Sequence, residues 1–249
     1  MHYVPHGKGV QSELDGPEFF FAPDGRQNPE AELISSLEAF GRDLKIGRLQ
    51  LHPQCAFPER FRFLVEKFKR SYPKVDCPKF REFLEMFHGP RGVSLVFSSA
   101  YPNNPASMFG HTFLKIESGR KNHLIDMGIN YAAIARRDTQ LLAFMYLGTM
   151  GGYKGMWSME PYFHKVNEYI NSESRDLWEY ELTLSPEETL RLLAHLWELE
   201  VTSYLDYYFF DENCSYQILR AIEAIRPSVM PVTRWTAAVW VGKSPNQKP

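Results

Sequence analysis

The stretch YYFFDENCSYQILRAIEAI, residues 207–225, joins a polar turn to an apolar run with helical spacing, and Cys214 stands at the junction. Asn213 is a residue type that favours the N-cap of a helix, so Cys214 is expected at the first helical position. A helix N-terminus offers unpaired N–H groups and a partial positive charge, which favour a thiolate over a thiol. The stretch therefore predicts a nucleophilic cysteine. The alternative is a small apolar side chain that happens to begin a helix.

The composition is that of a folded globular chain. Its 249 residues are 23% charged and 14% aromatic, which argues against a disordered protein. A formal net charge of −2 gives no basic surface for nucleic acid, so no nucleic-acid partner is expected. No run approaches the roughly 18 apolar residues of a membrane span, and residues 1–16 lack the apolar segment of a signal peptide.

The apolar pattern predicts helices first and strands afterwards. Helices are expected at 28–41, 57–71, 78–88 and 185–204, and strands at 92–101, 111–118, 123–133 and 176–184. The first helix has Asn28 as its cap and the last has a capping box of Ser185 and Glu188. A tight turn is expected at 118–121 and a glycine- and methionine-rich loop at 148–163.

His111 is the best placed of the eight histidines to take the proton of Cys214. It follows Gly110 at the start of a predicted strand, after a loop that can line a cleft. A thiolate needs such a base, oriented in turn by a third polar group. The alternative for a single histidine at a strand start is a partly exposed structural residue.

The register of the predicted hairpin ranks the third group. A two-residue turn makes paired residue numbers sum to an odd value, which places His111 opposite Asp126, Gly128 or Asn130. Asp126 or Asn130 can then accept the ring N–H of His111 and fix its tautomer, with Asn130 favoured if the turn is centred on 119–122. His123 has the wrong parity and is expected to be exposed.

The other two cysteines, Cys55 and Cys77, flank a helix-like stretch of a length that suits a disulfide. That pairing would leave Cys214 free, and the alternative is three reduced cysteines in a cytosolic protein. The spacing of histidines and cysteines shows no zinc pattern, so neither a metal nor another cofactor is expected.

A histidine on one strand, a polar residue on the next and a cysteine at a later helix start resemble the order in circularly permuted papain-like thiol enzymes. These include NlpC-type cell-wall peptidases and the lecithin–retinol acyltransferase group. The chain also resembles, over longer stretches, the N-terminal periplasmic domain of the Lnb family, whose members are bacterial lipoprotein N-acyltransferases. These stretches are CAFPERFRFL, SSAYPNNPASMFGHTFLKIE, GINYAA, GGYKGMWSMEPYFHKVNEYINSESRDLWEYEL, HLWEL and YYFFDENCSYQIL. This resemblance covers roughly residues 28–226.

The resemblance implies a permuted papain-like α+β fold, with a helical region at 1–90 packed on a catalytic core at 91–249 as one composite domain. It also implies a periplasmic or envelope location, which favours the Cys55–Cys77 disulfide, and acyl transfer by the Cys214–His111 pair. The implied donor is a phospholipid and the implied acceptor a lipoprotein amino terminus, with a membrane surface as a possible partner. Lnb proteins continue into a membrane-embedded region, so the chain is expected to be an excised domain or a stand-alone relative.

Candidate substrate contacts flank the catalytic residues in the sequence. Methionines around the glycine-rich segment can line an acyl-chain groove; ordinary packing is the alternative. The candidates are Ser107, Tyr153, Met156 and Trp157, with Met145, Met150 and Met159 beside them. Two other function classes stay open: an NlpC-type thiol peptidase or amidase acting on cell-wall peptides, and a non-catalytic binding module.

Overall fold

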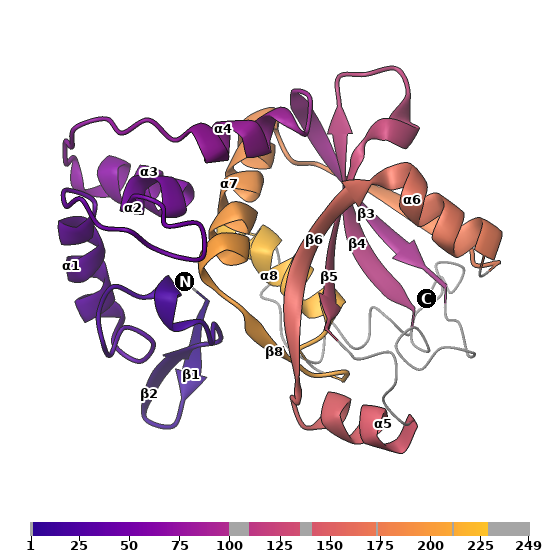
Figure 1. The fold of residues 1–249 in the computed structure, drawn as a ribbon, viewed down its shortest axis with the longest axis horizontal. Coiled ribbons are helices and arrows are strands. Elements are labelled where there is room, and N and C mark those ends of the chain that lie inside the picture. The colour runs from indigo at the N-terminus through magenta and orange to yellow at the C-terminus, as the bar shows by residue number, and fades with distance from the viewer. Residues whose placement is uncertain (1, 100–109, 135–140, 173, 211, 229–249) are drawn as a thin grey trace. The chain divides into compact units, whose positions relative to one another are not determined.

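The computed structural model describes residues 2–99, 110–134, 141–172, 174–210 and 212–228 (Figure 1). The chain divides into two compact units, one of residues 1–84 with 190–205 and the other of residues 85–189 with the chain from 206 onward. Helix α7 (Pro186–Thr202) therefore begins in the second unit and contributes most of its length to the first. The expected arrangement, a region at 1–90 packed on a core at 91–249, stays a prediction.

The first unit is built mainly from short helices. A hairpin of β1 (Tyr3–His6) and β2 (Gly9–Ser12) comes first, followed by the 3-10 helix η1 (Pro17–Phe19) and by α1 (Pro29–Ala39), α2 (Pro53–Ala56), α3 (Pro58–Phe68) and α4 (Pro78–Glu85). The Asn28 side chain accepts the N–H of Ala31 at 3.1 Å, which confirms the predicted cap. The three helices expected in this part of the chain are all present.

A buried charge and a disulfide stabilise the first unit. The Arg60 guanidinium lies 2.8 Å from Glu32 and stacks over the rings of Phe19 and Phe57 at 4.3 and 4.0 Å, so the buried cation has both a counter-ion and two aromatic faces. Cys55 and Cys77 are bonded to each other, with their Cα atoms 5.3 Å apart. The predicted disulfide is confirmed.

The second unit carries a six-stranded antiparallel sheet, in the order β7-β3-β4-β5-β6-β8. Its strands are β3 (Pro90–Ser98), β4 (His111–Ser118), β5 (Met127–Ala133), β6 (Tyr153–Pro161), β7 (Leu177–Leu182) and β8 (Leu205–Tyr207). Its other elements are η3 (His123–Ile125), α5 (Leu141–Thr149), α6 (Tyr162–Val166), the π-helical η4 (Asn167–Ser172) and α8 (Cys214–Ile225). The expected α+β class is confirmed, while the permuted papain-like arrangement stays a prediction.

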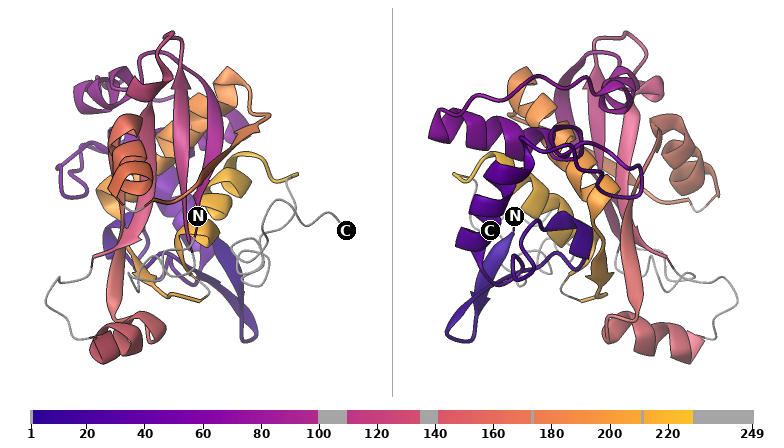
Figure 2. Two further views of the ribbon diagram at one scale, coloured as in Figure 1. Left: turned by 90° about the vertical axis from the view of Figure 1, so that its right-hand side faces the viewer. Right: turned by 60° about the vertical axis from the view of Figure 1, so that its left-hand side comes forward.

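Helices cover both faces of this sheet, α6 with η4 on one side and α8 on the other (Figure 2). On the α6 side, Val96, Phe113, Tyr162 and Tyr169 form a buried cluster. On the α8 side, the hydroxyl groups of Thr112 and Ser215 meet at 2.7 Å. Alternate residues of β4 thus face different helices, as the strand period of two requires.

Two local predictions were wrong. No tight turn joins β4 to β5, because η3 lies in the connection and β5 begins only at Met127. The predicted loop at 148–163 contains strand β6, in which Tyr153, Gly155 and Trp157 are buried while the residues between them are exposed. That period-two pattern was masked because glycine and methionine are not typical strand residues.

Candidate active site

Cys214 is the first residue of α8, and Asn213 is its N-cap, as the sequence predicted. The Asn213 side chain accepts the N–H of Tyr216 at 3.2 Å, which fixes the first turn of the helix. Cys214 is the free cysteine, and its side chain is buried. The thiol thus has the helix-start position that favours its ionised form.

His111 is the first residue of β4, and the glycine before it has a backbone conformation that other residues rarely adopt. Gly110 has a φ of +86°, and a Cβ there would lie 2.8 Å from both the Phe97 ring and the Ser98 carbonyl oxygen. Only glycine allows this backbone path without strain. The His111 carbonyl also accepts the Ser98 hydroxyl at 3.3 Å, and Ser98 in turn accepts from Arg175 at 2.6 Å.

The thiol and the imidazole are hydrogen-bonded and shift each other's pKa. Burial acts to raise the pKa of Cys214, but the charge of His111 and the hydrogen bond from its ring lower it to about 7, aided by the Thr112 N–H and the Tyr207 hydroxyl. Burial acts to lower the pKa of His111, but the charge of Cys214, the hydrogen bond to its sulfur and the bond to Asn130 raise it. Both shifts favour a thiolate–imidazolium pair.

Asn130 is the residue that holds the other side of the imidazole. Its Oδ1 accepts the Nε2–H of His111, which leaves Nδ1 for the sulfur. Leu114 pairs with Ile129, so the numbers of paired residues sum to an odd value, as predicted. The pairing is nevertheless displaced by two residues from the favoured one, in which His111 lies opposite Asn130. Continued along β4, it brings His111 level with Ala132, so Asn130 is a diagonal neighbour on the same face. The displacement follows from the longer connection.

Asp126 and His123 lie at the opposite end of the hairpin. The buried carboxylate of Asp126 accepts the backbone N–H and the hydroxyl of Ser118, at 3.0 and 2.6 Å. Its other oxygen lies 3.2 Å from Nδ1 of His123, whose side chain is 64% exposed as predicted. The structure therefore brings Cys214, His111 and Asn130 together. Asp126 lies apart from them and binds Ser118 at the connection between β4 and β5.

Several neighbours of the sulfur were not predicted. The backbone N–H of Thr112 and the hydroxyl of Tyr207 both point to it, and the Tyr169 ring lies 6.3 Å from that of His111. Tyr207 belongs to the edge strand β8, for which three residues give no periodic signal, and Tyr169 lies on the π-helical turn. A backbone N–H leaves no trace in a sequence at all.

Three of the four candidate substrate contacts, Tyr153, Met156 and Trp157, lie on β6. Tyr153 and Trp157 are buried on one face of β6, and Met156 lies on the other face with 38% of its surface exposed. Among the described residues, the Tyr153 hydroxyl and the Trp157 Nε1 have no hydrogen-bond partner. Ser107 lies outside the described residues. Their part in substrate binding stays a prediction.

Within the described parts of the chain, no three histidine, cysteine or acidic side chains are grouped so as to hold a metal ion. No described helix has the length and apolar character needed to cross a membrane.

The models of two protein families together match most of the chain. Residues 80–239 match the model of the Lnb N-terminal periplasmic domain, and residues 1–67 match a domain family of unknown function (DUF7843). No curated protein matches the chain, and no solved structure does. The first match includes the whole six-stranded sheet and α8, together with every residue of the candidate site. The chain belongs to the Lnb N-terminal periplasmic domain family and is a periplasmic protein of the cell envelope.

Proposed function

We propose that this protein transfers an acyl group from a phospholipid to the amino terminus of a lipoprotein through a thioester on Cys214. One observation carries the proposal: a buried thiol at a helix start is hydrogen-bonded to His111, whose other ring nitrogen donates to Asn130. Nucleophile, base and orienting group are the three parts that thiol acyl chemistry needs. Family membership, which relates the chain to Lnb-type lipoprotein modification, supports the choice of acceptor.

The proposed reaction has two halves. In the first, the Cys214 thiolate attacks the ester carbonyl of the donor, and the tetrahedral intermediate expels the lysophospholipid alkoxide, which takes its proton from His111. In the second, the acceptor amine attacks the thioester while neutral His111 takes the amine proton, and the thiolate leaves. Each half leaves His111 in the protonation state from which the next half begins.

Helix α5 supports a lipid donor. Its nine residues carry no charge, and the side chains of Leu142, Tyr146 and Met150 are 85%, 66% and 61% exposed. A spacing of four residues places all three along one side of a helical path. A water-exposed apolar stripe of this kind fits the headgroup–acyl boundary of a membrane.

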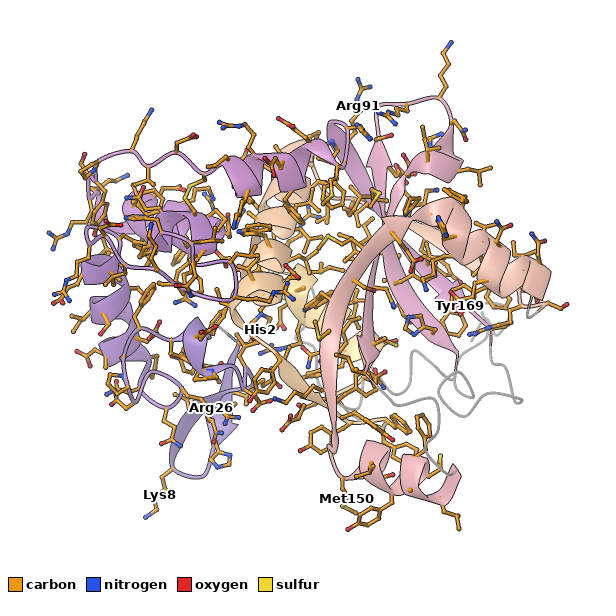
Figure 3. The ribbon with its side chains drawn as sticks, viewed as in Figure 1. His2, Lys8, Arg26, Arg91, Met150 and Tyr169 are labelled. Atoms are coloured by element: carbon orange, nitrogen blue, oxygen red, sulfur yellow. A yellow bond between two sulfur atoms is a disulfide. The ribbon has the colours of Figure 1, made fainter. Side chains whose placement is uncertain are left out.

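The opposite side of α5 holds the helix to the rest of the second unit. The Phe144 ring lies 5.0 Å from that of Phe209 and 5.6 Å from that of Tyr153, and the Phe209 N–H donates to the Gly148 carbonyl at 2.9 Å. Phe209 belongs to the segment that leads into Cys214. These contacts attach α5 to β6 and to the segment before Cys214. Figure 1 shows α5 next to the start of β6, and Figure 3 shows Met150 beside α5.

Charge favours a phospholipid membrane as the partner of the stripe. The sequence ARRDTQ precedes α5, and Lys154 follows it, so the flanking segments are basic on balance. Interfacial helices bind anionic membranes through this combination of apolar side chains and neighbouring cations. The proposed membrane surface is thus the source of the proposed acyl donor.

The deciding experiment is mass spectrometry of the protein after incubation with phospholipid vesicles. A mass increase of one acyl chain is expected, located on Cys214 and removed by hydroxylamine, as a thioester requires. Cys214→Ser is the control that should gain no hydroxylamine-labile acyl group. Cleavage of cell-wall peptides without any acyl adduct would replace the proposal by an NlpC-type peptidase, and a thiol that neither acylates nor reacts faster than free cysteine would indicate a binding module.

A further inference from the structure

Tyr207 makes two contacts with the nucleophile, one with its backbone and one with its sulfur. The Cys214 N–H donates to the phenolic oxygen at 3.3 Å, and the phenol O–H is hydrogen-bonded to the thiol side chain. The ring is held from two sides, by the nearly parallel ring of Tyr131 at 5.6 Å and by Phe209 at 6.0 Å. The hydroxyl is thus fixed at the reacting atom by packing that does not involve the sulfur.

These contacts change what can stabilise the tetrahedral intermediate. The backbone N–H of a helix-start nucleophile is the simplest oxyanion donor, but here that N–H already has an acceptor. A substrate oxygen that approached it would have to displace the Tyr207 hydroxyl or share the position with it. The O–H of Tyr207, by contrast, donates to the atom from which negative charge departs.

We infer that Tyr207 is an oxyanion donor of this site: its O–H is bonded to the Cys214 sulfur at rest and donates to the carbonyl oxygen once the sulfur has attacked. The inference rests on the proposed acyl transfer and names a catalytic residue for it.

The charge balance of the step supports this role. When the S–C bond forms, the electron pair of the carbonyl π bond moves to oxygen, so one negative charge passes from sulfur to an oxygen on the same carbon. A donor bonded to the sulfur needs only to rotate its O–H to follow that charge. Burial and the neighbouring Cys214 charge raise the pKa of Tyr207 well above its ordinary value, so the phenol keeps its proton throughout.

The test compares two reactions of the same sulfur in Tyr207→Phe. Alkylation by iodoacetamide forms no oxyanion, whereas acylation by a soluble p-nitrophenyl ester passes through one. Loss of the hydroxyl is expected to slow acylation by about 10²-fold or more, the usual effect of one oxyanion donor. Alkylation, measured over the same pH range and corrected for thiolate fraction, should change by less than about threefold, since only the resting hydrogen bond is lost.

Two further variants keep the result specific. Tyr162→Phe removes another buried phenol hydroxyl of the same unit, one bonded to Glu179, and should leave both reactions near the wild-type rates. Replacement of Tyr207 by 3-fluorotyrosine keeps the hydroxyl and should restore acylation. Equal slowing of both reactions in Tyr207→Phe would overturn the inference alone. A wild-type thiol that alkylates but is not acylated by the ester would overturn the proposed function and the inference with it.

Discussion

At the scale of single residues, Cys214 and His111 stabilise each other's charged form, so neither pKa belongs to one residue alone. The contacts that lower the thiol pKa to about 7 act against burial, which raises it. Removal of the imidazole therefore does not return the thiol to its ordinary pKa. It leaves a buried thiol whose largest remaining influence opposes ionisation.

His111→Ala should consequently raise the pKa of Cys214 above that of a free thiol. Wild-type alkylation by iodoacetamide should rise with pH to a plateau with a midpoint near 7, because the thiolate is the reactive form. In the variant the midpoint should move above about 8.5, the value of an unperturbed cysteine, and the rate at pH 7 should fall at least about tenfold. An unchanged midpoint in His111→Ala would contradict the pairing.

Asn130 and Asp126 should separate catalysis from stability. Asn130→Ala removes the acceptor of the His111 Nε2–H, so the ring samples other orientations, and acyl transfer should fall at least about tenfold without unfolding. Asp126→Ala strands the Ser118 N–H and hydroxyl in the protein interior. It should lower the free energy of unfolding by about 1–3 kcal/mol while the folded fraction keeps its rate. Denaturant titration beside single-turnover acylation checks both, and the reverse assignment of effects would mean that the site is wrong.

At the scale of elements, the site depends on where the connections between strands lie. Because β4, β5 and β6 pair in antiparallel registers, the start of β4, the end of β5 and the start of β6 meet at one end of the sheet. That end carries His111 and the helix α5, whereas η3 lies at the other end. Membrane contact and catalysis are therefore proposed for the same end of the second unit.

The double variant Leu142→Ser, Tyr146→Ser tests the apolar stripe. Both side chains are mostly exposed, so the fold should be preserved, while binding to vesicles that contain anionic phospholipid should weaken at least about tenfold, given 1.5–3 kcal/mol for burial of one large apolar side chain. Acylation by a soluble ester should not change. Leu124→Ser is the matched control, because Leu124 is 50% exposed but lies on η3. Sedimentation with vesicles measures the effect, and equal binding by the stripe variant and the control would rule out this membrane surface.

The elements also show which parts of the fold could be predicted from the sequence. Caps and periodicity predicted α1, α7 and α8 because these signals lie within a few residues of one another. Parity predicted that Asn130 and His111 share a face, but the register was displaced, because η3 lengthened a connection expected to be a tight turn. The contacts of Tyr207 and Thr112 with the sulfur were not predictable, since they depend on how α8 lies against the sheet.

At the scale of the whole molecule, the two units carry different sulfur chemistry. The disulfide lies in the first unit and the free thiol in the second. Cys55→Ala with Cys77→Ala should lower the free energy of unfolding by about 3 kcal/mol, since the bond closes a loop of 22 residues. The alkylation rate of Cys214 in the native protein should stay the same. Calorimetry and thiol titration measure the two quantities, and a large loss of Cys214 reactivity would contradict the prediction.

His111 lies far from Cys214 along the chain, and this separation affects the order in which the disulfide and the thiolate form during folding. In an unfolded chain Cys214 has no contact with His111, so it keeps the ordinary thiol pKa and is only a few per cent thiolate at neutral pH. Cys55 and Cys77 are close in sequence, and the entropy of loop closure favours their pairing over any bond to the distant Cys214. An oxidising compartment would thus form the correct disulfide first, while the future nucleophile is chemically quiet. Folding itself generates the reactive thiolate, so a misfolded copy is also an inert one.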